Sequence, residues 1–249
     1  MKRVLVVGGS DSGGGAGIQA DVKTLHSLGV HAATVVTAVT AQDSQAVHGV
    51  WEVPLDAVEL QLRAVLDDLG ADVVKTGMLP GDCVEVVARA VAGLPLVVDP
   101  VGVSSTGHQL ADPRALRPLL HQATVVTPNL AEVEALTGVV VSGPDDLFAA
   151  AEAVHALGPQ WVLVTGGHLH GEPLDLLYDG TTAHALRGRR VATPHTHGTG
   201  CTLASALAGH LALGQPVPVA AQHAKEAVTR ALERAYPLGA GAGPVNPGP

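Results

Sequence analysis

Aromatic and basic residues are scarce in this chain, and each shortage excludes a class of protein. Phe, Trp and Tyr make up 2% of the 249 residues, so the stacking platforms that bind single-stranded nucleic acid are nearly absent. Lys and Arg number 14 against 23 Asp and Glu; the formal net charge of -9 argues against a general binder of the phosphate backbone. No nucleic-acid partner is therefore expected, although a local glycine nest can still hold the phosphates of one nucleotide.

Cysteines and long apolar runs are also scarce. The two cysteines, Cys83 and Cys201, are too few for a disulfide framework and form no C-x-x-C pair. A reducing cytoplasm is the simplest compartment for such a chain. The apolar run near the N-terminus is too short for the core of a signal peptide, and no span of about 20 apolar residues follows it. We therefore expect no membrane partner.

Valine, leucine and alanine supply the core. Hydrophobic residues make up 47% of the chain, and short valine-rich segments alternate with longer segments of helical periodicity. The short segments are 3–7, 32–38, 72–75, 96–99, 124–127 and 161–165. This alternation predicts a three-layer α/β/α sandwich with a mostly parallel central sheet, and an antiparallel hairpin at 174–186 on one edge. We expect one domain over residues 1–249, with a loosely attached Gly/Pro-rich tail over 239–249.

Polar residues recur just beyond the carboxyl ends of these predicted strands, where open α/β sheets bind their ligands. They are Asp11, Gln42, Thr76, Asp99, Asn129 and Thr165. This agreement between six strand ends predicts a site at that edge of the sheet.

A Gly-Thr-Gly-Cys sequence stands at the start of an apolar helical pattern. Small residues let backbone N–H groups converge, and a helix N-terminus adds partial positive charge, so Gly198, Thr199 and Gly200 predict an anion site. Cys201 follows, where a helix N-terminus lowers the pKa of a thiol and favours a thiolate or a base. The alternative is a small buried cysteine at a helix start. A zinc site formed with His195 and His197 is weakly supported, because no second pair of ligands matches their spacing.

Two further motifs have both a structural and a functional interpretation. The glycine-rich segment 8–17 is either a dinucleotide loop or a tight turn from strand to helix, and Asp21 beyond it would alone be an ordinary solvated residue. Asn129 and Glu132 have the spacing of a capping box, but together with Asp99 they could serve a Mg²⁺–phosphate cluster through water. Asp99 could equally form a turn before Pro100.

Taken together, the motifs resemble those of the bacterial hydroxymethylpyrimidine/phosphomethylpyrimidine kinases of thiamine biosynthesis, in the ribokinase superfamily. The resemblance runs from residue 4 to about 235. It depends on six segments in order: 14–21, 75–79, 98–101, 127–132, 166–169 and 196–201. It implies an ATP-dependent kinase that phosphorylates the hydroxymethyl group of 4-amino-5-hydroxymethyl-2-methylpyrimidine and then converts the monophosphate to the diphosphate.

The same resemblance assigns roles to individual residues. It implies substrate contacts from Gly9, Asp21, Gln42 and Met78, with a cover formed by about 40–51. It implies an anion hole at Gly198, Thr199 and Gly200, with Cys201 as the base. ATP and phosphate contacts are expected from Lys75, Asn129, Thr165 and Gly167, and Mg²⁺ contacts from Asp99 and Glu132. A homodimer is also expected, and the two histidines are then interpreted as scaffold.

Two alternatives stay open. A pyridoxal or pyridoxine kinase is one, since the same fold and cysteine-type site occur in pyridoxal kinases that resemble this family. A catalytically silent protein that senses the pyrimidine or a nucleotide is the other: Thr165 stands where the family often has a lysine, so a phosphate-facing cation is missing. Gln42 and Met78 favour the smaller pyrimidine over pyridoxal.

Overall fold

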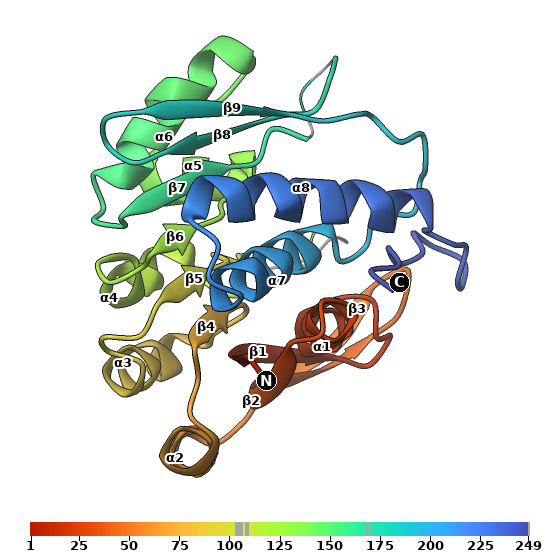
Figure 1. Cartoon of the computed structure of the whole chain (residues 1–249). Helices are drawn as coiled ribbons and strands as arrows, with labels where there is room; N and C mark the ends of the chain where they lie inside the picture. Colours follow the sequence, from red (N-terminus) through yellow and green to blue (C-terminus); the bar gives the residue numbers. More distant parts are fainter. Residues whose placement is uncertain (103–106, 108–109, 168, 170, 249) are drawn as a thin grey trace.

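The computed structural model describes residues 1–102, 107, 110–167, 169 and 171–248; His168 of the predicted motif 166–169 lies outside them. The strands are β1 (Arg3–Asp11), β2 (His31–Gln42), β3 (Val47–Glu52), β4 (Val73–Thr76), β5 (Leu96–Val98), β6 (Val125–Val126), β7 (Trp161–Val164), β8 (Leu174–Tyr178) and β9 (Ala183–Arg187). Among the described residues they form one sheet in the order β3-β2-β1-β4-β5-β6-β7-β8-β9 (Figure 1).

The centre of the sheet is parallel and both of its edges are antiparallel. β2, β1, β4, β5, β6 and β7 pair in parallel, whereas β3 pairs antiparallel with β2, and β8 and β9 add an antiparallel hairpin beside β7. The predicted parallel sheet and edge hairpin are therefore confirmed. β3 was not predicted: none of its residues is buried, so the sequence there has no strong apolar alternation.

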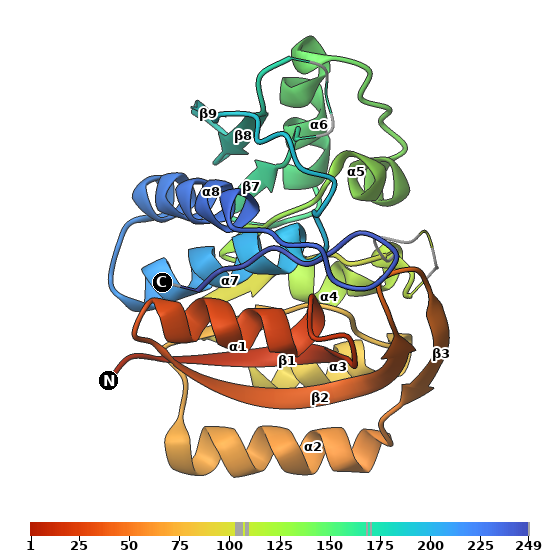
Figure 2. The same cartoon turned by 90° about the vertical axis from the view of Figure 1, so that its right-hand side faces the viewer.

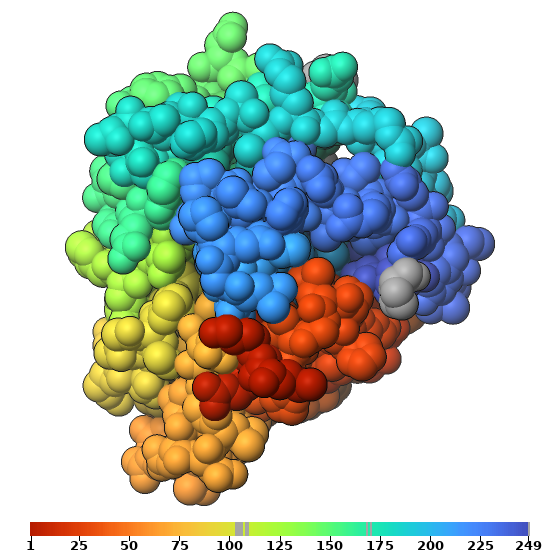
Figure 3. All heavy atoms as spheres, viewed as in Figure 1, coloured from red at the N-terminus to blue at the C-terminus, as the bar shows by residue number. Residues whose placement is uncertain are grey.

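Helices cover both faces of the sheet. They are α1 (Gly17–Ser27), α2 (Leu55–Ala64), α3 (Gly81–Ala90), α4 (Arg117–Leu120), α5 (Leu130–Thr137), α6 (Leu147–His155), α7 (Thr199–Ala212) and α8 (Val217–Glu233). Figure 2 shows α1 on one side of β1 and β2, with α2 on the other side. α3 shares the buried cluster of α2. In the space-filling view, α8 crosses the middle of one face, between the β8–β9 hairpin and the N-terminal segment (Figure 3).

Alternation along the strands divides the core in two. Successive side chains of a strand point to opposite faces, so Leu5 and Val7 of β1 join the buried cluster that contains α2, α3 and α6 residues. Val4 and Val6 join the opposite cluster, with residues of α1, α7 and α8. The three-layer α/β/α sandwich is thus confirmed. Among the described residues, no helix combines the length and the apolar character needed to cross a bilayer.

The C-terminal tail differs from the expectation of a loose end. Val245 is buried, and its N–H donates to the carbonyl of His197 at 3.0 Å. The Asn246 N–H donates to Ala231 of α8, and the Gly241 N–H donates to Ser44 Oγ, both at 3.0 Å. Glycines and prolines indicated flexibility, but backbone hydrogen bonds fix this segment across the domain (Figure 2).

Candidate active site

One buried carboxylate organises the loop after β1. Asp11 accepts the N–H groups of Gly13 at 2.8 Å, Gly15 at 3.0 Å and Ala16 at 2.8 Å. Burial acts to raise the pKa of Asp11, but hydrogen bonds from His197, Ala16 and Gly13 hold it below its usual range. Because these N–H groups already bind Asp11, the loop is a strand-to-helix turn rather than a dinucleotide cradle.

This loop touches the segment that begins α7. Gly198 has a φ of +88°, and a Cβ there would lie 1.9 Å from the carbonyl oxygen of Gly15. A Cβ on Gly15 would in turn lie 2.4 Å from Cδ2 of His197. Only glycine fits at these two positions, because the two backbones meet there. The contact joins the predicted substrate side of the site to the predicted anion hole.

The N-terminus of α7 is arranged as an anion site requires. Gly198 is the N-cap residue, Thr199 is partly exposed and Gly200 is exposed. N–H groups in the first turn of a helix have no acceptors within the helix, and the helix dipole adds positive potential there. Gly198, Thr199 and Gly200 therefore lie at a helix end that favours an oxyanion, although the Thr199 N–H already donates to the Thr196 carbonyl at 3.3 Å.

Cys201 differs from the sequence prediction in its acidity. Burial raises its pKa to about 12; the charge of Lys75 opposes this shift, and the charges of Asp21 and Asp99 add to it. The helix N-terminus predicted a lowered pKa, but desolvation of the thiol and the two neighbouring carboxylates outweigh it. In the free protein Cys201 is therefore a thiol.

Lys75 lies at the centre of a buried charge cluster next to this thiol. Its Nζ is 3.0 Å from Asp21 Oδ1, 3.1 Å from Asp21 Oδ2 and 3.6 Å from Asp99 Oδ2. Ser205 Oγ of α7 donates to Asp21 Oδ1 at 2.6 Å. Lys75 is 0% exposed and Asp21 is 1% exposed, and in the free protein each neutralises the other. The phosphate contact expected of Lys75 and the substrate contact expected of Asp21 stay predictions.

Gly9, Met78 and Gln42 lie around the same strand ends. A Cβ on Gly9 would approach Met78 Sδ to 3.0 Å, so the two residues are neighbours, and both are buried. Gln42 is partly exposed, and its Nε2 lies 3.3 Å from His197 Nε2. The structure therefore brings the Gln42 amide, with its NH₂ group toward the His197 ring, to the segment that ends in the anion hole.

Asn129 and Glu132 form the capping box that their spacing predicts. The Glu132 N–H donates to Asn129 Oδ1 at 3.0 Å, and the Asn129 N–H donates to Glu132 Oε2 at 2.8 Å. Burial, and then the charge of Asp99, raise the pKa of Glu132 to about 8. Burial likewise raises the pKa of Asp99 to about 6. Two partly protonated carboxyls thus lie close together at the sheet edge.

These carboxyls fit a cation that keeps most of its water. Asp99 Oδ2 is buried without a hydrogen-bond partner in the part of the chain that the structure describes. No group of three or more His, Cys, Asp or Glu side chains that could hold a metal occurs among the same residues. A Mg²⁺ ion here would therefore take most of its ligands from water and from phosphate oxygens, as this ion commonly does.

Thr165 and Gly167 lie beside Asn129 on the next strand end. Thr165 forms a parallel bridge with Asn129, and its N–H donates to the Pro128 carbonyl at 2.9 Å. Gly167 is exposed. Arg190 donates to the carbonyl oxygens of Gly167 at 3.2 Å, Leu169 at 2.7 Å and Gly171 at 2.9 Å. Arg190 thus stabilises the loop that follows Thr165, the residue at the position where the family often has a lysine.

Sequence reasoning missed the residues that support this loop from behind. The Gly166 N–H donates to Asp175 Oδ1 at 3.0 Å, and Lys225 of α8 donates to Asp175 Oδ2 at 2.6 Å. No motif marks Asp175, Lys225 or Arg190, because they are far apart in the chain. Lys225 lies on an otherwise apolar helix face, and this was the one signal in the sequence that it has a buried partner.

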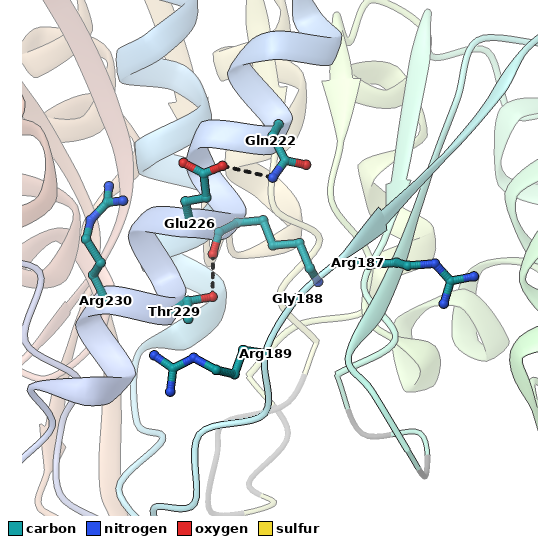
Figure 4. Close-up of a pocket in the computed structure, with 8 residues that line it drawn as sticks. Arg187, Gly188, Arg189, Gln222, Glu226, Thr229 and Arg230 are labelled. Carbon is teal, nitrogen blue, oxygen red and sulfur yellow. Dashed lines mark hydrogen bonds between the residues drawn. The ribbon is translucent and has the colours of Figure 1, made fainter.

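A separate concavity lies between α8 and the segment after β9 (Figure 4). Its lining residues are Arg187, Gly188, Arg189, Gln222, Lys225, Glu226, Thr229 and Arg230. Gln222 donates to Glu226 there at 2.9 Å. None of the predicted site residues lines this concavity.

Known proteins match the chain over nearly its whole length. The family model described as phosphomethylpyrimidine kinase matches residues 11–246. A hydroxymethylpyrimidine/phosphomethylpyrimidine kinase of Streptomyces coelicolor is 57% identical over 252 residues, covering 98% of this chain and 94% of that protein. The ADP complex of Bacillus subtilis pyridoxal kinase has a TM-score of 0.91 at 40% identity, covering 99% of this chain and 97% of that chain. The phosphomethylpyrimidine kinase of Clostridium difficile has a TM-score of 0.80 at 34% identity, covering 93% of this chain and 100% of that chain.

Proposed function

The chain belongs to the phosphomethylpyrimidine kinase family, and from that premise we propose that it phosphorylates 4-amino-5-hydroxymethyl-2-methylpyrimidine with ATP and then converts the monophosphate to the diphosphate, in thiamine biosynthesis. One observation carries the proposal. The glycine contact between the β1 loop and the α7 N-terminus brings the proposed pyrimidine side of the site next to the proposed anion hole. At such a junction a hydroxyl acceptor and a phosphoryl group can meet.

Gly9, Gln42 and Met78 are the proposed contacts for the pyrimidine. Gly9 and Met78 offer a flat apolar wall, and the Gln42 amide offers both a donor and an acceptor to a polar ring edge. Asp21 lies behind these residues, where it accepts hydrogen bonds from Lys75 and from the Ser205 hydroxyl of α7. Its proposed effect on the substrate is therefore indirect.

Gly198, Thr199 and Gly200 are proposed to stabilise the phosphoryl group in transit. Phosphoryl transfer depends on positioning and on charge stabilisation more than on covalent chemistry by the protein. As a thiolate, Cys201 is the proposed acceptor of the hydroxyl proton, and the proton of the thiol leaves to solvent before that step. Because the carboxylates of Asp21 and Asp99 help to keep its pKa at about 12, neutralising Asp99 would lower that pKa and increase the thiolate fraction.

Asn129, Thr165 and Gly167 are proposed to meet the ATP phosphates. Oδ1 of the Asn129 side chain already accepts the Glu132 N–H in the helix cap. The side-chain NH₂ group is therefore the donor that Asn129 can offer to a phosphate. Asp99 and Glu132 are the proposed partners of Mg²⁺, which would supply positive charge beside the phosphates when bound. ADP and an ATP analogue occupy solved pyridoxal kinases of Staphylococcus aureus that are 33–34% identical to this chain, which supports ATP as the donor.

The test is a coupled ATP-consumption assay with the hydroxymethylpyrimidine and with pyridoxal, read together with mass spectrometry of the products. We expect both the monophosphate and the diphosphate from the pyrimidine, with a higher kcat/KM than for pyridoxal. Activity on pyridoxal alone would overturn the proposal. Binding of the pyrimidine with no turnover under Mg-ATP would instead indicate a sensor.

Pyridoxal kinase is the second candidate function. It is favoured by the similarity in fold to the Bacillus subtilis and Staphylococcus aureus pyridoxal kinases. The higher sequence identity to the Streptomyces kinase makes it the weaker candidate. The same assay ranks the two substrates.

We also propose a homodimer in a reducing cytoplasm. β3 is an edge strand that leaves Trp51 60% exposed, and Val39 of β2 is 46% exposed. An apolar edge of this kind favours pairing with a second copy. Light scattering of the wild type and of Trp51→Glu tests the dimer: a monomeric wild type would overturn it.

Cys83 and Cys201 are both free cysteines, which supports the proposed reducing compartment.

A further inference from the structure

We propose that His197 is a positioning residue that sets the orientation of the Gln42 amide, so that its NH₂ group faces the substrate. This inference rests on the proposed function, because it assigns Gln42 to the pyrimidine. His197 is only 8% exposed and directly precedes the anion hole. Its role would therefore be to couple the pyrimidine pocket to the phosphoryl site.

The imidazole lies between two polar side chains that come from different strands. His197 Nε2 is 3.0 Å from Asp11 Oδ2 at the end of β1, and 3.3 Å from the Gln42 amide at the end of β2. Its Cδ2 lies against Gly15, where a Cβ would approach to 2.4 Å. The ring therefore cannot move toward the loop without a collision, and its Nε2 is directed at both neighbours.

Hydrogen-bond chemistry then determines what Gln42 can present. The Asp11 carboxylate is ionised and only accepts, so Nε2 carries the hydrogen that it donates to Asp11. A donor on Nε2 repels an NH₂ group and attracts a carbonyl oxygen. The structure places Gln42 Nε2 at 3.3 Å from this donor. The proposed orientation turns the amide by half a turn, so that Oε1 shares the His197 Nε2 hydrogen with Asp11 and the NH₂ group is directed away from the ring. An NH₂ group fits an acceptor such as a ring nitrogen of a pyrimidine.

Two backbone hydrogen bonds hold His197 from the other side. Its N–H donates to the Gly243 carbonyl at 3.3 Å, and its carbonyl accepts the Val245 N–H at 3.0 Å. The buried C-terminal tail thus pairs with His197 as a short parallel bridge at Pro244. This pairing fixes the backbone, so the ring has a defined distance to Asp11 and Gln42.

The test compares three variants in steady-state kinetics. His197→Leu removes the donor and is expected to raise the KM for the hydroxymethylpyrimidine by ~10-fold, with the KM for ATP changed less than about twofold, since one oriented hydrogen bond corresponds to roughly a tenfold change. His197→Gln places an amide nitrogen near the position of Nε2 and is expected to recover the KM to within ~3-fold of wild type. His26→Leu is the control: His26 is an exposed residue near the C-terminal end of α1, and the substrate KM is expected to stay unchanged.

A double-mutant cycle identifies Gln42 as the mediator. In a Gln42→Ala background, His197→Leu is expected to raise the substrate KM by less than about twofold, because the side chain through which it acts is gone. Multiplicative effects of the two substitutions would overturn the inference. So would equal rises in the KM for ATP and for the pyrimidine, or a His26→Leu variant that behaves like His197→Leu. A wild type with no activity on the pyrimidine would overturn the proposed function itself.

Discussion

Two buried lysines, one on each side of the site, make similar ion pairs in different surroundings. Lys75 on β4 is 3.0 Å from Asp21, and Lys225 on α8 is 2.6 Å from Asp175. Each also faces a glycine: a Cβ on Gly77 would lie 3.1 Å from Lys75 Nζ, and one on Gly188 would lie 2.7 Å from Lys225 Cε. In both places a missing side chain leaves room for the lysine.

The difference between the two pairs is their charge balance. Lys225 faces one carboxylate, whose other oxygen accepts the Gly166 N–H, so the pair is neutral and fixes a loop. Lys75 faces two carboxylates, and Asp99 Oδ2 has no hydrogen-bond partner among the described residues. A neutral pair braces the fold. A cluster with a surplus negative charge can also respond to a cation and can change the acidity of Cys201.

The largest expected effect is the loss of Lys75. Lys75→Met leaves Asp21 and Asp99 buried without a counter-charge, and we expect the free energy of unfolding to fall by ~3–5 kcal/mol. We also expect turnover to fall by ~100-fold or more, since a preorganised charge beside the reacting groups is removed. Urea unfolding and kcat measure the two effects.

Two variants sharpen this test. Lys2→Met removes an exposed partner of Asp72, a pair whose contribution should be below ~1 kcal/mol. Asp21→Asn combined with Lys75→Met removes one unpaired carboxylate and is expected to regain part of the stability but not the turnover. If turnover returned together with stability, the Lys75 cluster would be structural only, like the Lys225 pair.

The loss of the Cys201 thiol separates chemistry from folding in the same cluster. Cys201→Ala is expected to lower kcat by ~100-fold, the usual size of a general-base effect, with little change in the substrate Kd. Isothermal titration of the pyrimidine and single-turnover kinetics measure the two quantities. Parallel losses in binding and turnover would instead assign Cys201 to packing.

The Lys225 pair is expected to affect ATP rather than the chemical step. Lys225→Met leaves Asp175 unpaired, and we expect a loss of ~3 kcal/mol in the free energy of unfolding. Because Asp175 also holds the Gly166 N–H, the KM for ATP should rise by several-fold, while the KM for the pyrimidine stays constant. A fall in kcat as large as that of Lys75→Met would remove the distinction between the two pairs.

The features of this molecule that the sequence predicts are those determined by residues close together in the chain. Continuous valine runs predicted the sheet and both helical layers, because strands that are buried on both faces have no polar alternation. The capping box of Asn129 and Glu132 and the start of α7 were predicted from spacing alone. β3 was missed because an exposed edge strand needs no continuous apolar pattern.

Determinants that depend on burial could not be predicted. Lys75 and Asp21 are 54 positions apart, and only the fold shows that each is the other's partner. The local rule for a helix N-terminus predicted a low pKa for Cys201, whereas desolvation and two distant aspartates raise it. The Gly/Pro content of the tail likewise gave no sign of its backbone pairing with His197.

A pH dependence of stability is expected at Asp99 and Glu132. Both side chains have a raised pKa in the folded protein, about 6 for Asp99 and about 8 for Glu132, so the folded state binds protons more tightly than the unfolded state. Their contribution to stability is therefore complete below about pH 4 and is lost as the pH rises through about 8. We expect the free energy of unfolding to fall between pH 5 and pH 8, with a slope of up to ~1.4 kcal/mol per pH unit for each of the two groups.

Glu132→Gln tests this slope without breaking the helix cap, because glutamine also forms a capping box. The variant should lose most of the slope between pH 5 and pH 8, and Glu134→Gln, which changes an exposed residue of the same helix, should keep it. In the wild type, millimolar Mg²⁺ should stabilise the protein more at pH 8 than at pH 5, because the ionised pair is then present. Equal stabilisation at both pH values would show that the surplus charge beside Lys75 does not attract the cation, and would remove the functional difference between the two lysine clusters.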